Sequence, residues 1–172
     1  MSIKYEDLRL IAKNGDLFLF EGRSFISRFI RAVTGQQISH VAMLIWIGDG
    51  LWVAEMLEGR NYQLTPASQR IKELCGAGNV YYGSRPLECK GKGQIIYDTA
   101  MLYRGSKYGY LSLFKVWWSQ FTRRKGTVEK LVCSTFVEKC WEAAGYEMPH
   151  LPDPGDFMLH SAIIIPVRCS HA

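Results

Sequence analysis

The sequence lacks any hydrophobic run long enough to cross a membrane. Its longest apolar stretch, Val41 to Ile47, has the length of a single strand, whereas a transmembrane helix needs about 18 apolar residues or more. The stretch from Met1 to Arg9 is polar and carries acidic side chains, so it does not have the apolar segment of a secretory signal. We therefore expect a cytoplasmic protein without a signal peptide or a transmembrane segment.

Cysteine motifs of the kinds that bind metals are also missing. The five cysteines are Cys75, Cys89, Cys133, Cys140 and Cys169, and no two of them form a Cys-x-x-Cys pair. No two histidines lie at ligand spacing on a helix, so we expect no zinc site and no metal or organic cofactor. An odd number of widely spaced cysteines without an export signal favours reduced thiols.

Neither sign of charge is in large excess. The 21 basic and 16 acidic residues give a net charge of +5, and part of this excess lies in the run Arg123-Arg124-Lys125. Such a run is usually a solvated loop, and contact with nucleic acid or an anionic membrane is the alternative. We expect no nucleic-acid partner.

The chain does have enough apolar material for one packed core. Its 172 residues fit a single domain over residues 1–172, and 48% of them are hydrophobic. Apolar periodicity predicts strands over 16–20, 38–47, 51–57, 62–64, 80–82 and 162–167. It predicts helices over 24–33, 66–74, 94–103, 111–121 and 133–144. This mixture of hairpins and helices predicts an α+β fold.

Cys133 is the candidate nucleophile. The pattern from Thr135 to Glu138 fits a capping box, so Cys133 is predicted to lie at or just before the start of a helix. The macrodipole and the free N–H groups at that end stabilise a thiolate and can hold an oxyanion. The alternative is a small buried core cysteine, which is the better interpretation of Cys140 on the apolar stripe of the same helix.

His40 and Glu55 are the candidates for a base and its partner. His40 lies on a strand that is apolar on both faces, so its ring should be buried and its nitrogens should need partners. A purely structural histidine is the alternative. Glu55 lies in the apolar stretch 51–57, where an ionised carboxylate is costly unless it is paired. It could orient an imidazolium, or it could face water on an edge strand.

The hairpin between the two strands predicts a separation that disfavours contact of these residues. A two-residue turn at Asp49-Gly50 would pair Leu44 with Glu55. Glu55 and His40 would then share a face but lie roughly 13 Å apart along the strand. A three-residue turn would put them on opposite faces, so a bulge or a strong twist would be needed to bring them together.

Three segments taken together resemble a known family. They are Ser39-His40-Val41-Ala42-Met43-Leu44, then Glu55, then Leu131-Val132-Cys133-Ser134-Thr135-Phe136-Val137. In this His-Glu-Cys order they look like the permuted, YiiX/YaeF-like branch of the NlpC/P60 papain-like superfamily. The likeness covers residues 14–160 and includes Gly15-Asp16, the predicted helix 25–34 and the segment 107–110.

The resemblance implies a circularly permuted papain-like α+β fold, in which helices pack on an antiparallel sheet and the nucleophile begins a helix. It also implies a cysteine hydrolase whose catalytic residues are Cys133, His40 and Glu55. Such an enzyme would cleave an amide of a peptide, an isopeptide or a lysine-containing compound through an acyl-thioester intermediate.

The same resemblance suggests the residues that contact the substrate, which are Tyr108, Ser39 and Ser134. The family often has Tyr-Asp where this chain has Tyr108-Gly109. The role of that aspartate is therefore lost or moved to another residue.

Two other functions stay open. The first is a lipid acyl hydrolase or acyltransferase of the lecithin:retinol acyltransferase type, which the aromatic segment 111–121 beside a basic run favours. In this case Trp117, Trp118 and Phe121 would contact a membrane surface or an acyl substrate. The second is a non-catalytic binding module that keeps the fold.

Overall fold

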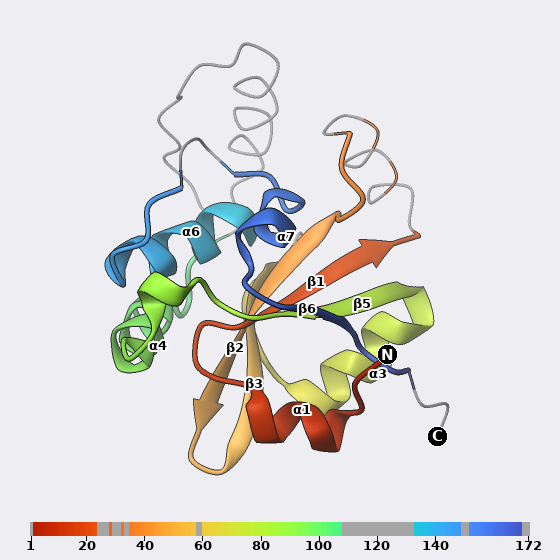
Figure 1. The fold of residues 1–172 in the computed structure, drawn as a ribbon, viewed down its shortest axis with the longest axis horizontal. Coiled ribbons are helices and arrows are strands. Elements are labelled where there is room, and N and C mark those ends of the chain that lie inside the picture. The colour runs from red at the N-terminus through yellow and green to blue at the C-terminus, as the bar shows by residue number, and fades with distance from the viewer. Residues whose placement is uncertain are drawn as a thin grey trace.

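The structure is a computed structural model that describes residues 2–23, 28, 32, 35–57, 60–107, 133–148 and 152–169. Its strands are β1 (Leu17–Gly22), β2 (His40–Ile47), β3 (Gly50–Leu57), β4 (Asn61–Pro66), β5 (Gly78–Gly83) and β6 (Ile164–Pro166). Its helices are α1 (Tyr5–Ile11), α3 (Ala67–Ala77), α4 (Gly93–Leu102), α6 (Cys133–Ala143), α7 (Asp156–His160) and the 3-10 helix η1 (Leu87–Cys89) (Figure 1).

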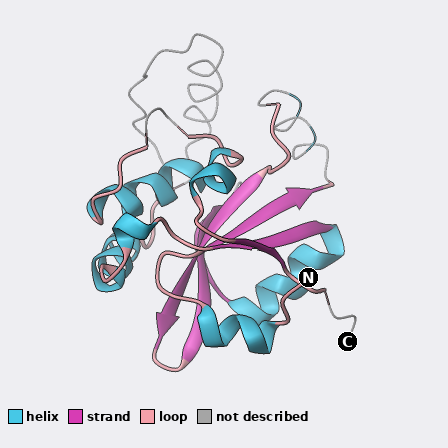
Figure 2. Cartoon of the chain, viewed as in Figure 1, coloured by secondary structure: helices cyan, strands magenta, loops and turns pink. Residues whose placement is uncertain are grey.

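The strands form one antiparallel sheet in the order β4-β3-β2-β1-β5-β6. Helices lie on both faces of this sheet, as Figure 2 shows. α4 and α6 cover one face, and α1 and α3 cover the other (Figure 1). The α+β class predicted from the sequence is confirmed.

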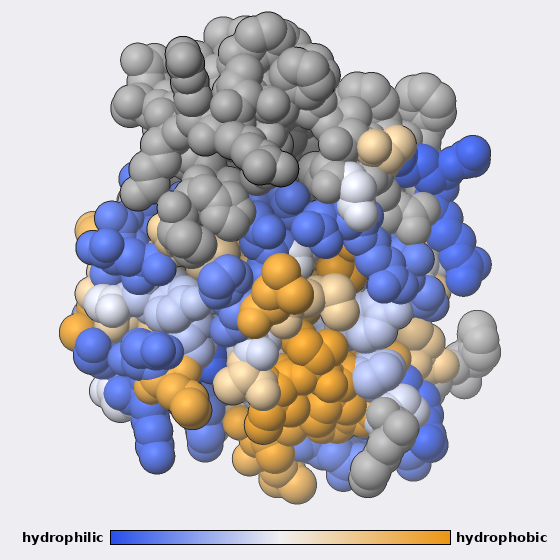
Figure 3. Space-filling model, turned by 45° about the horizontal axis from the view of Figure 1, so that its top comes forward, coloured by the Kyte–Doolittle hydropathy of each residue, from blue (hydrophilic) through white to orange (hydrophobic). Residues whose placement is uncertain are grey.

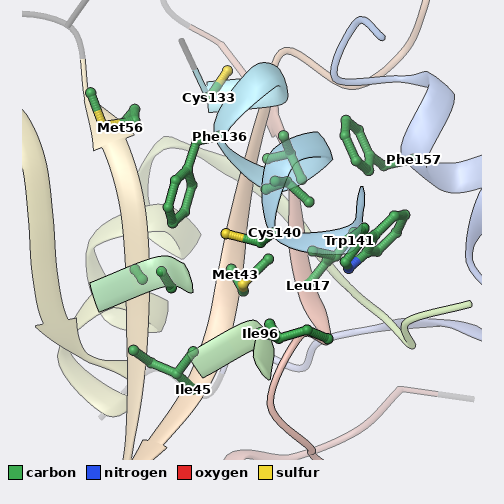
Figure 4. Close-up of a cluster of buried hydrophobic side chains, with 14 of the residues drawn as sticks. Leu17, Met43, Ile45, Met56, Ile96, Cys133, Phe136, Cys140, Trp141 and Phe157 are labelled. Atoms are coloured by element: carbon green, nitrogen blue, oxygen red, sulfur yellow. The ribbon is translucent and has the colours of Figure 1, made fainter. Parts of the chain in front are cut away.

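Strand β2 is apolar on both sides because both faces of the sheet are covered. Val41, Met43 and Ile45 point into a cluster that contains the buried stripe of α6, and Figure 4 shows this cluster around Cys140. Ala42 and Leu44 point into the second cluster, which contains the buried residues of α1 and α3. The burial along this strand therefore agrees with the prediction that both of its faces are apolar.

Helix α6 is fixed to the sheet by its largest side chain. Trp141 is fully buried, and its indole Nε1 donates a hydrogen bond of 3.0 Å to the carbonyl oxygen of Gly15, just before β1. The helix begins at Cys133, as the sequence predicts. Thr135 is the third helical residue and not the N-cap, so the predicted capping box is wrong.

Most of the predicted elements are present with shifted ends, and three helices in the described part of the chain, α1, η1 and α7, are additional. α1 lies in the polar N-terminal stretch, where Leu8 is its one buried residue. α7 is a short helix that follows Pro152 and Pro154. The helices predicted over 24–33 and 111–121 fall wholly or largely outside the described residues.

Two of the five cysteines form a disulfide. Cys75, near the end of α3, is bonded to Cys169, after β6, with a separation of 94 residues in the sequence. The expectation that all cysteines are reduced thiols is therefore wrong for this pair. Disulfides persist mainly in oxidising compartments, so the pair gives no support to a cytoplasmic location.

The described surface carries several large apolar side chains among polar ones. Figure 3 shows an apolar area on one face. The exposed large hydrophobic residues are Leu10, Ile11, Leu87, Ile95, Leu102, Leu159 and Ile163. Of the helices that the structure describes, none combines the length and hydrophobicity needed to cross a membrane.

Candidate active site

The first residue of β2 and the first residue of α6 meet at one end of the sheet. His40 opens β2 opposite Phe20 of β1, and its side chain is 15% exposed. Cys133 opens α6 and is 5% exposed. Figure 4 shows Cys133 at the end of the apolar cluster, whereas Cys140 lies within it. The two helix cysteines therefore have different surroundings, as their sequence positions suggested.

Glu55 reaches His40 directly. Nε2 of His40 lies 2.7 Å from Oε2 of Glu55, and the Glu55 side chain is completely buried. Glu55 lies on β3, which is flanked by β2 and β4. Both the expected long separation from His40 and the alternative of a water-facing edge glutamate are therefore wrong.

The position of the hairpin turn accounts for this contact. Ile47 pairs with Gly50 and Met43 pairs with Ala54, so the two turn residues are Gly48-Asp49 and not Asp49-Gly50. Gly48 has a φ of +55°, which suits glycine in a tight hairpin. The register moves by two residues, which puts Glu55 about 7 Å along the strand from His40, within diagonal reach on the same face.

The His40 side chain interacts with both Glu55 and Cys133. Nε2 is hydrogen-bonded to Glu55, and Cys133 contributes to the electrostatics of the same ring. Burial on its own lowers the pKa of His40, but the hydrogen bonds and charges of Cys133 and Glu55 outweigh burial and raise this pKa from 6.5 to about 9. The arrangement therefore favours an imidazolium at neutral pH.

The partners of His40 also determine which ring nitrogen carries a proton and which can accept one. An ionised carboxylate only accepts hydrogen bonds, so Nε2 of His40 carries the proton shared with Glu55. Nδ1 is then the ring nitrogen that is available to Cys133. In the neutral ring Nδ1 is then the free acceptor, which is the state needed to take a proton from a thiol.

Arg70 is a functional candidate that the sequence reasoning missed. Its Nη2 donates a hydrogen bond of 2.9 Å to Oε2 of Glu55, and its Nε lies 2.6 Å from Oε1. Burial raises the pKa of Glu55, but the hydrogen bond and charge of His40, followed by those of Arg70, lower it overall. The sequence signal was a charged residue among the buried positions of α3.

Two of the three residues predicted to contact the substrate are described, and both are buried. Ser39 is buried, and its hydroxyl donates to the carbonyl oxygen of Phe20 and accepts from the N–H of Gly22, so it fastens the start of β2 to β1. Ser134 is buried in the first turn of α6. Tyr108 lies outside the described residues, as do Trp117, Trp118 and Phe121, and a substrate contact at any of these stays a prediction.

The Gly15-Asp16 pair lies before β1, at the end of that strand remote from His40. The carboxylate of Asp16 accepts hydrogen bonds from the N–H groups of Lys13 and Arg85 and from the hydroxyl of Tyr82. This part of the resemblance therefore has a structural role.

The remaining free cysteines are buried and poorly suited to ionise. Burial raises the pKa of Cys89 to about 11, and it raises the pKa of Cys140 as well. Among the described residues no group of three or more His, Cys, Asp or Glu side chains is arranged to hold a metal ion. A hollow of about 350 Å³ near Trp46 and Arg85 does not include the Cys133 site.

Comparisons with known proteins give a fold likeness without a family. No family model matches the chain, and no curated protein matches it. The chain is similar to the crystal structure of the metalloprotein YiiX of Escherichia coli O157:H7, which carries the family designation DUF1105. The TM-score is 0.60 at 23% sequence identity, over 78% of this chain and 68% of that one. The chain therefore has a fold like that of YiiX.

Proposed function

We propose that this protein is a cysteine-nucleophile hydrolase that cleaves an amide through an acyl-thioester on Cys133. The observation that carries the proposal is the grouping of Cys133, His40 and the buried Glu55, in which Nε2 of His40 lies 2.7 Å from Oε2 of Glu55 and the same side chain interacts with Cys133 at the start of α6. Isolated buried cysteines and histidines are common. Here a cysteine at the start of a helix and a buried carboxylate interact with the same histidine. Such a group is typical of a nucleophile, its base and the residue that orients the base.

The first step is attack by sulfur. Transfer of the thiol proton to Nδ1 of His40 gives a thiolate and an imidazolium, and the Glu55 carboxylate stabilises the imidazolium. The thiolate adds to the carbonyl carbon, His40 returns the proton to the leaving amine, and the C–N bond breaks to leave a thioester. Water, deprotonated by the now neutral His40, then hydrolyses the thioester and regenerates the thiol.

The start of α6 would stabilise the charge that develops on the carbonyl oxygen. The first N–H groups of a helix have no acceptor within the helix, and those of Cys133 and Ser134 belong to this first turn. The positive end of the helix macrodipole favours both the thiolate and an oxyanion at this place. Of the two serine positions that the resemblance pointed to, Ser134 would thus act through its backbone.

The likeness to YiiX agrees with the resemblance seen in the sequence. We include in the proposal that the chain has the permuted papain-like arrangement of the NlpC/P60 superfamily, in which histidine and glutamate precede the cysteine. YiiX is described as a metalloprotein, and Cys, His and Glu are all zinc ligand types. Metal dependence is therefore included in the test.

The test is hydrolysis of two substrate sets by matched variants. Peptidyl p-nitroanilides and Nε-acyl-lysine amides represent amides, and vesicles of acyl lipids represent esters, each with and without a chelator. We expect amide cleavage that survives the chelator, is lost in Cys133→Ala and is kept in Cys140→Ala, the same deletion two turns along the same helix. Equal turnover in Cys133→Ala and wild type would end the proposal.

A lipid acyl hydrolase is the second candidate, and one surface observation favours it. The described face in Figure 3 has an apolar area, and Leu102 and Leu159 project large apolar side chains into solvent. Such surfaces often mark interaction with lipids or proteins. Cleavage of the lipid esters but not of the amides by the same Cys133-dependent activity would favour this candidate over the first.

A further inference from the structure

Helix α3 turns a charged side chain toward the sheet. The buried residues of α3 are Ala67, Ile71 and Leu74, which recur at the spacing of one helix face. Arg70 lies on this same face, one position before Ile71, and its side chain is only 12% exposed. An arginine at a core-facing position needs a partner, because an unpaired buried charge is costly.

The partner is the carboxylate that holds His40. Arg70 contacts both oxygens of Glu55, with Nη2 at 2.9 Å from Oε2 and Nε at 2.6 Å from Oε1. Oε2 is also the oxygen bonded to Nε2 of His40. One of these contacts is a hydrogen bond and the other is an ion-pair contact. Together they restrict the position of the carboxylate and balance its charge.

We propose that Arg70 is a positioning residue of the active site, which holds Glu55 ionised and oriented so that His40 presents Nδ1 to Cys133. This inference rests on the proposed function, since it assigns a part in that same reaction. Arg70 touches neither Cys133 nor the reacting atoms, and it acts through Glu55.

Charge balance is the physical reason. Once the thiolate has formed, the buried groups are the Cys133 anion, the His40 cation and the Glu55 anion. Without a further cation, the His40 imidazolium would be the one positive charge beside the two anions in a region with little water. This would destabilise both the thiolate and the carboxylate. Arg70 supplies the second cation, so that four charges of alternating sign follow one another from α6 across the sheet to α3.

Among the described residues, few charged groups contact Cys133, His40, Glu55 or Arg70. Cys133 faces His40 from α6, and Glu55 faces it from β3. Arg70 faces Glu55 from α3, and Glu73 on the same helix accepts a hydrogen bond of 2.9 Å from Nη1 of Arg70. Glu73 is 40% exposed and belongs to the surface end of the network. It therefore provides a control that touches the same arginine without touching Glu55.

A purely structural role is the competing explanation, in which Arg70 only fastens α3 to the sheet. The two explanations differ in what happens to the ionisation of Cys133. A fastening residue affects stability and leaves the thiolate pH profile of the folded protein unchanged. A positioning residue moves that profile, and it does so only while Glu55 is a carboxylate.

The experiment measures the rate of iodoacetamide alkylation of Cys133 from pH 4 to pH 10 in folded protein. We compare wild type with Arg70→Met, Arg70→Lys and Glu73→Gln, and we measure kcat and KM for the best amide substrate in parallel. In Arg70→Met we expect the pH range over which the alkylation rate of Cys133 rises to lie about one pH unit higher than in wild type. At a pH below this range the alkylation rate should therefore be about tenfold lower. Arg70→Lys should recover part of this loss, and Glu73→Gln should match wild type. KM should change less than kcat.

A double substitution tests the route of the effect. In a Glu55→Gln background Arg70→Met should alter alkylation less than twofold, because the group through which Arg70 acts is gone. This double variant also contains no buried carboxylate that lacks a cation. If Arg70→Met alone does not fold, the alkylation rates of the double variant and of Arg70→Lys are compared with those of Glu55→Gln and of wild type.

The outcomes separate the two proposals. An unchanged pH profile in Arg70→Met, or an equal shift in the Glu55→Gln background, would overturn the role of Arg70 while leaving Cys133 activated. If Cys133 in wild type reacts no faster at low pH than a free thiol, the proposed function itself fails.

Discussion

Replacing Glu55 with glutamine removes one charge from the centre of the buried network and keeps its shape. The glutamine has one acceptor oxygen where Glu55 has two. Oε2 of Glu55 is hydrogen-bonded to His40 and accepts from Nη2 of Arg70, and Oε1 lies 2.6 Å from Nε of Arg70 in an ion-pair contact. If the amide oxygen faces His40, the NH₂ group faces Nε of Arg70, which is also a donor. If the amide turns over, its NH₂ group faces Nε2 of His40 and favours the tautomer with the proton on Nδ1, which cannot accept the thiol proton.

The structure sets the size of the effect. The rise of the His40 pKa from 6.5 to about 9 corresponds to about 3 kcal/mol in favour of the imidazolium, at about 1.4 kcal/mol per pH unit. Cys133 and Glu55 share this stabilisation, so losing the Glu55 charge should lower the His40 pKa. With the cost of the wrong tautomer, we expect turnover to fall by a factor on the order of 10 to 10³.

Stability should fall less than activity. The ion pair between Arg70 and residue 55 is lost in either amide orientation, at a cost of about 1 to 3 kcal/mol in the free energy of unfolding. The assay is amide hydrolysis together with urea denaturation, and Glu73→Gln is the matched control because Glu73 is the other carboxylate on Arg70. Normal turnover by folded Glu55→Gln would remove Glu55 from the mechanism and leave a pair of Cys133 and His40.

Three further predictions concern other parts of the account. Cys133 should be alkylated by iodoacetamide before the two other free cysteines, as peptide mapping would show, and faster labelling of either of those would contradict its activation. Because the folded-state pKa of His40 is raised, its contribution to the free energy of unfolding should be complete below pH 6.5 and lost as the pH rises to about 9. Urea denaturation should show this loss in wild type and not in His40→Gln. A free energy of unfolding in wild type that does not change over this pH range would refute the ion pair. Replacing Cys75 and Cys169 together with alanine should cost about 2 to 5 kcal/mol, and an unchanged urea midpoint after reduction of the wild type would show that the bond does not constrain the chain.

Local sequence patterns were sufficient for the sheet. They also placed the start of α6 at Cys133, although the capping box from which that start was predicted is wrong. Both faces of β2 are apolar because both are covered, and this is visible in the alternation around His40. The register of the hairpin was not predictable in the same way. Moving the turn by one position shifts the pairing by two residues, and this keeps every side chain on its face. The apolar pattern is therefore the same for Gly48-Asp49 and Asp49-Gly50.

Contacts between elements that are distant in the sequence account for what the sequence did not show. Arg70 could have been noticed as a charge on the buried face of α3, but only the fold brings it to Glu55. The disulfide joins Cys75 and Cys169 across 94 residues, and pairing among five cysteines cannot be deduced from spacing. α1 was missed because its polar residues hide a single buried anchor, Leu8.

The most direct test of the central claim is detection of the acyl-enzyme by intact mass after a rapid acid quench. The probe is p-nitrophenyl acetate, added in small excess to wild type, Cys133→Ala, His40→Ala and urea-unfolded protein. We predict one acetyl group per chain, located on the Cys133 peptide. It should form fast in folded wild type and slowly in His40→Ala and in the unfolded chain. Equal acetylation of Cys133→Ala, or equal rates in folded and unfolded wild type, would contradict it.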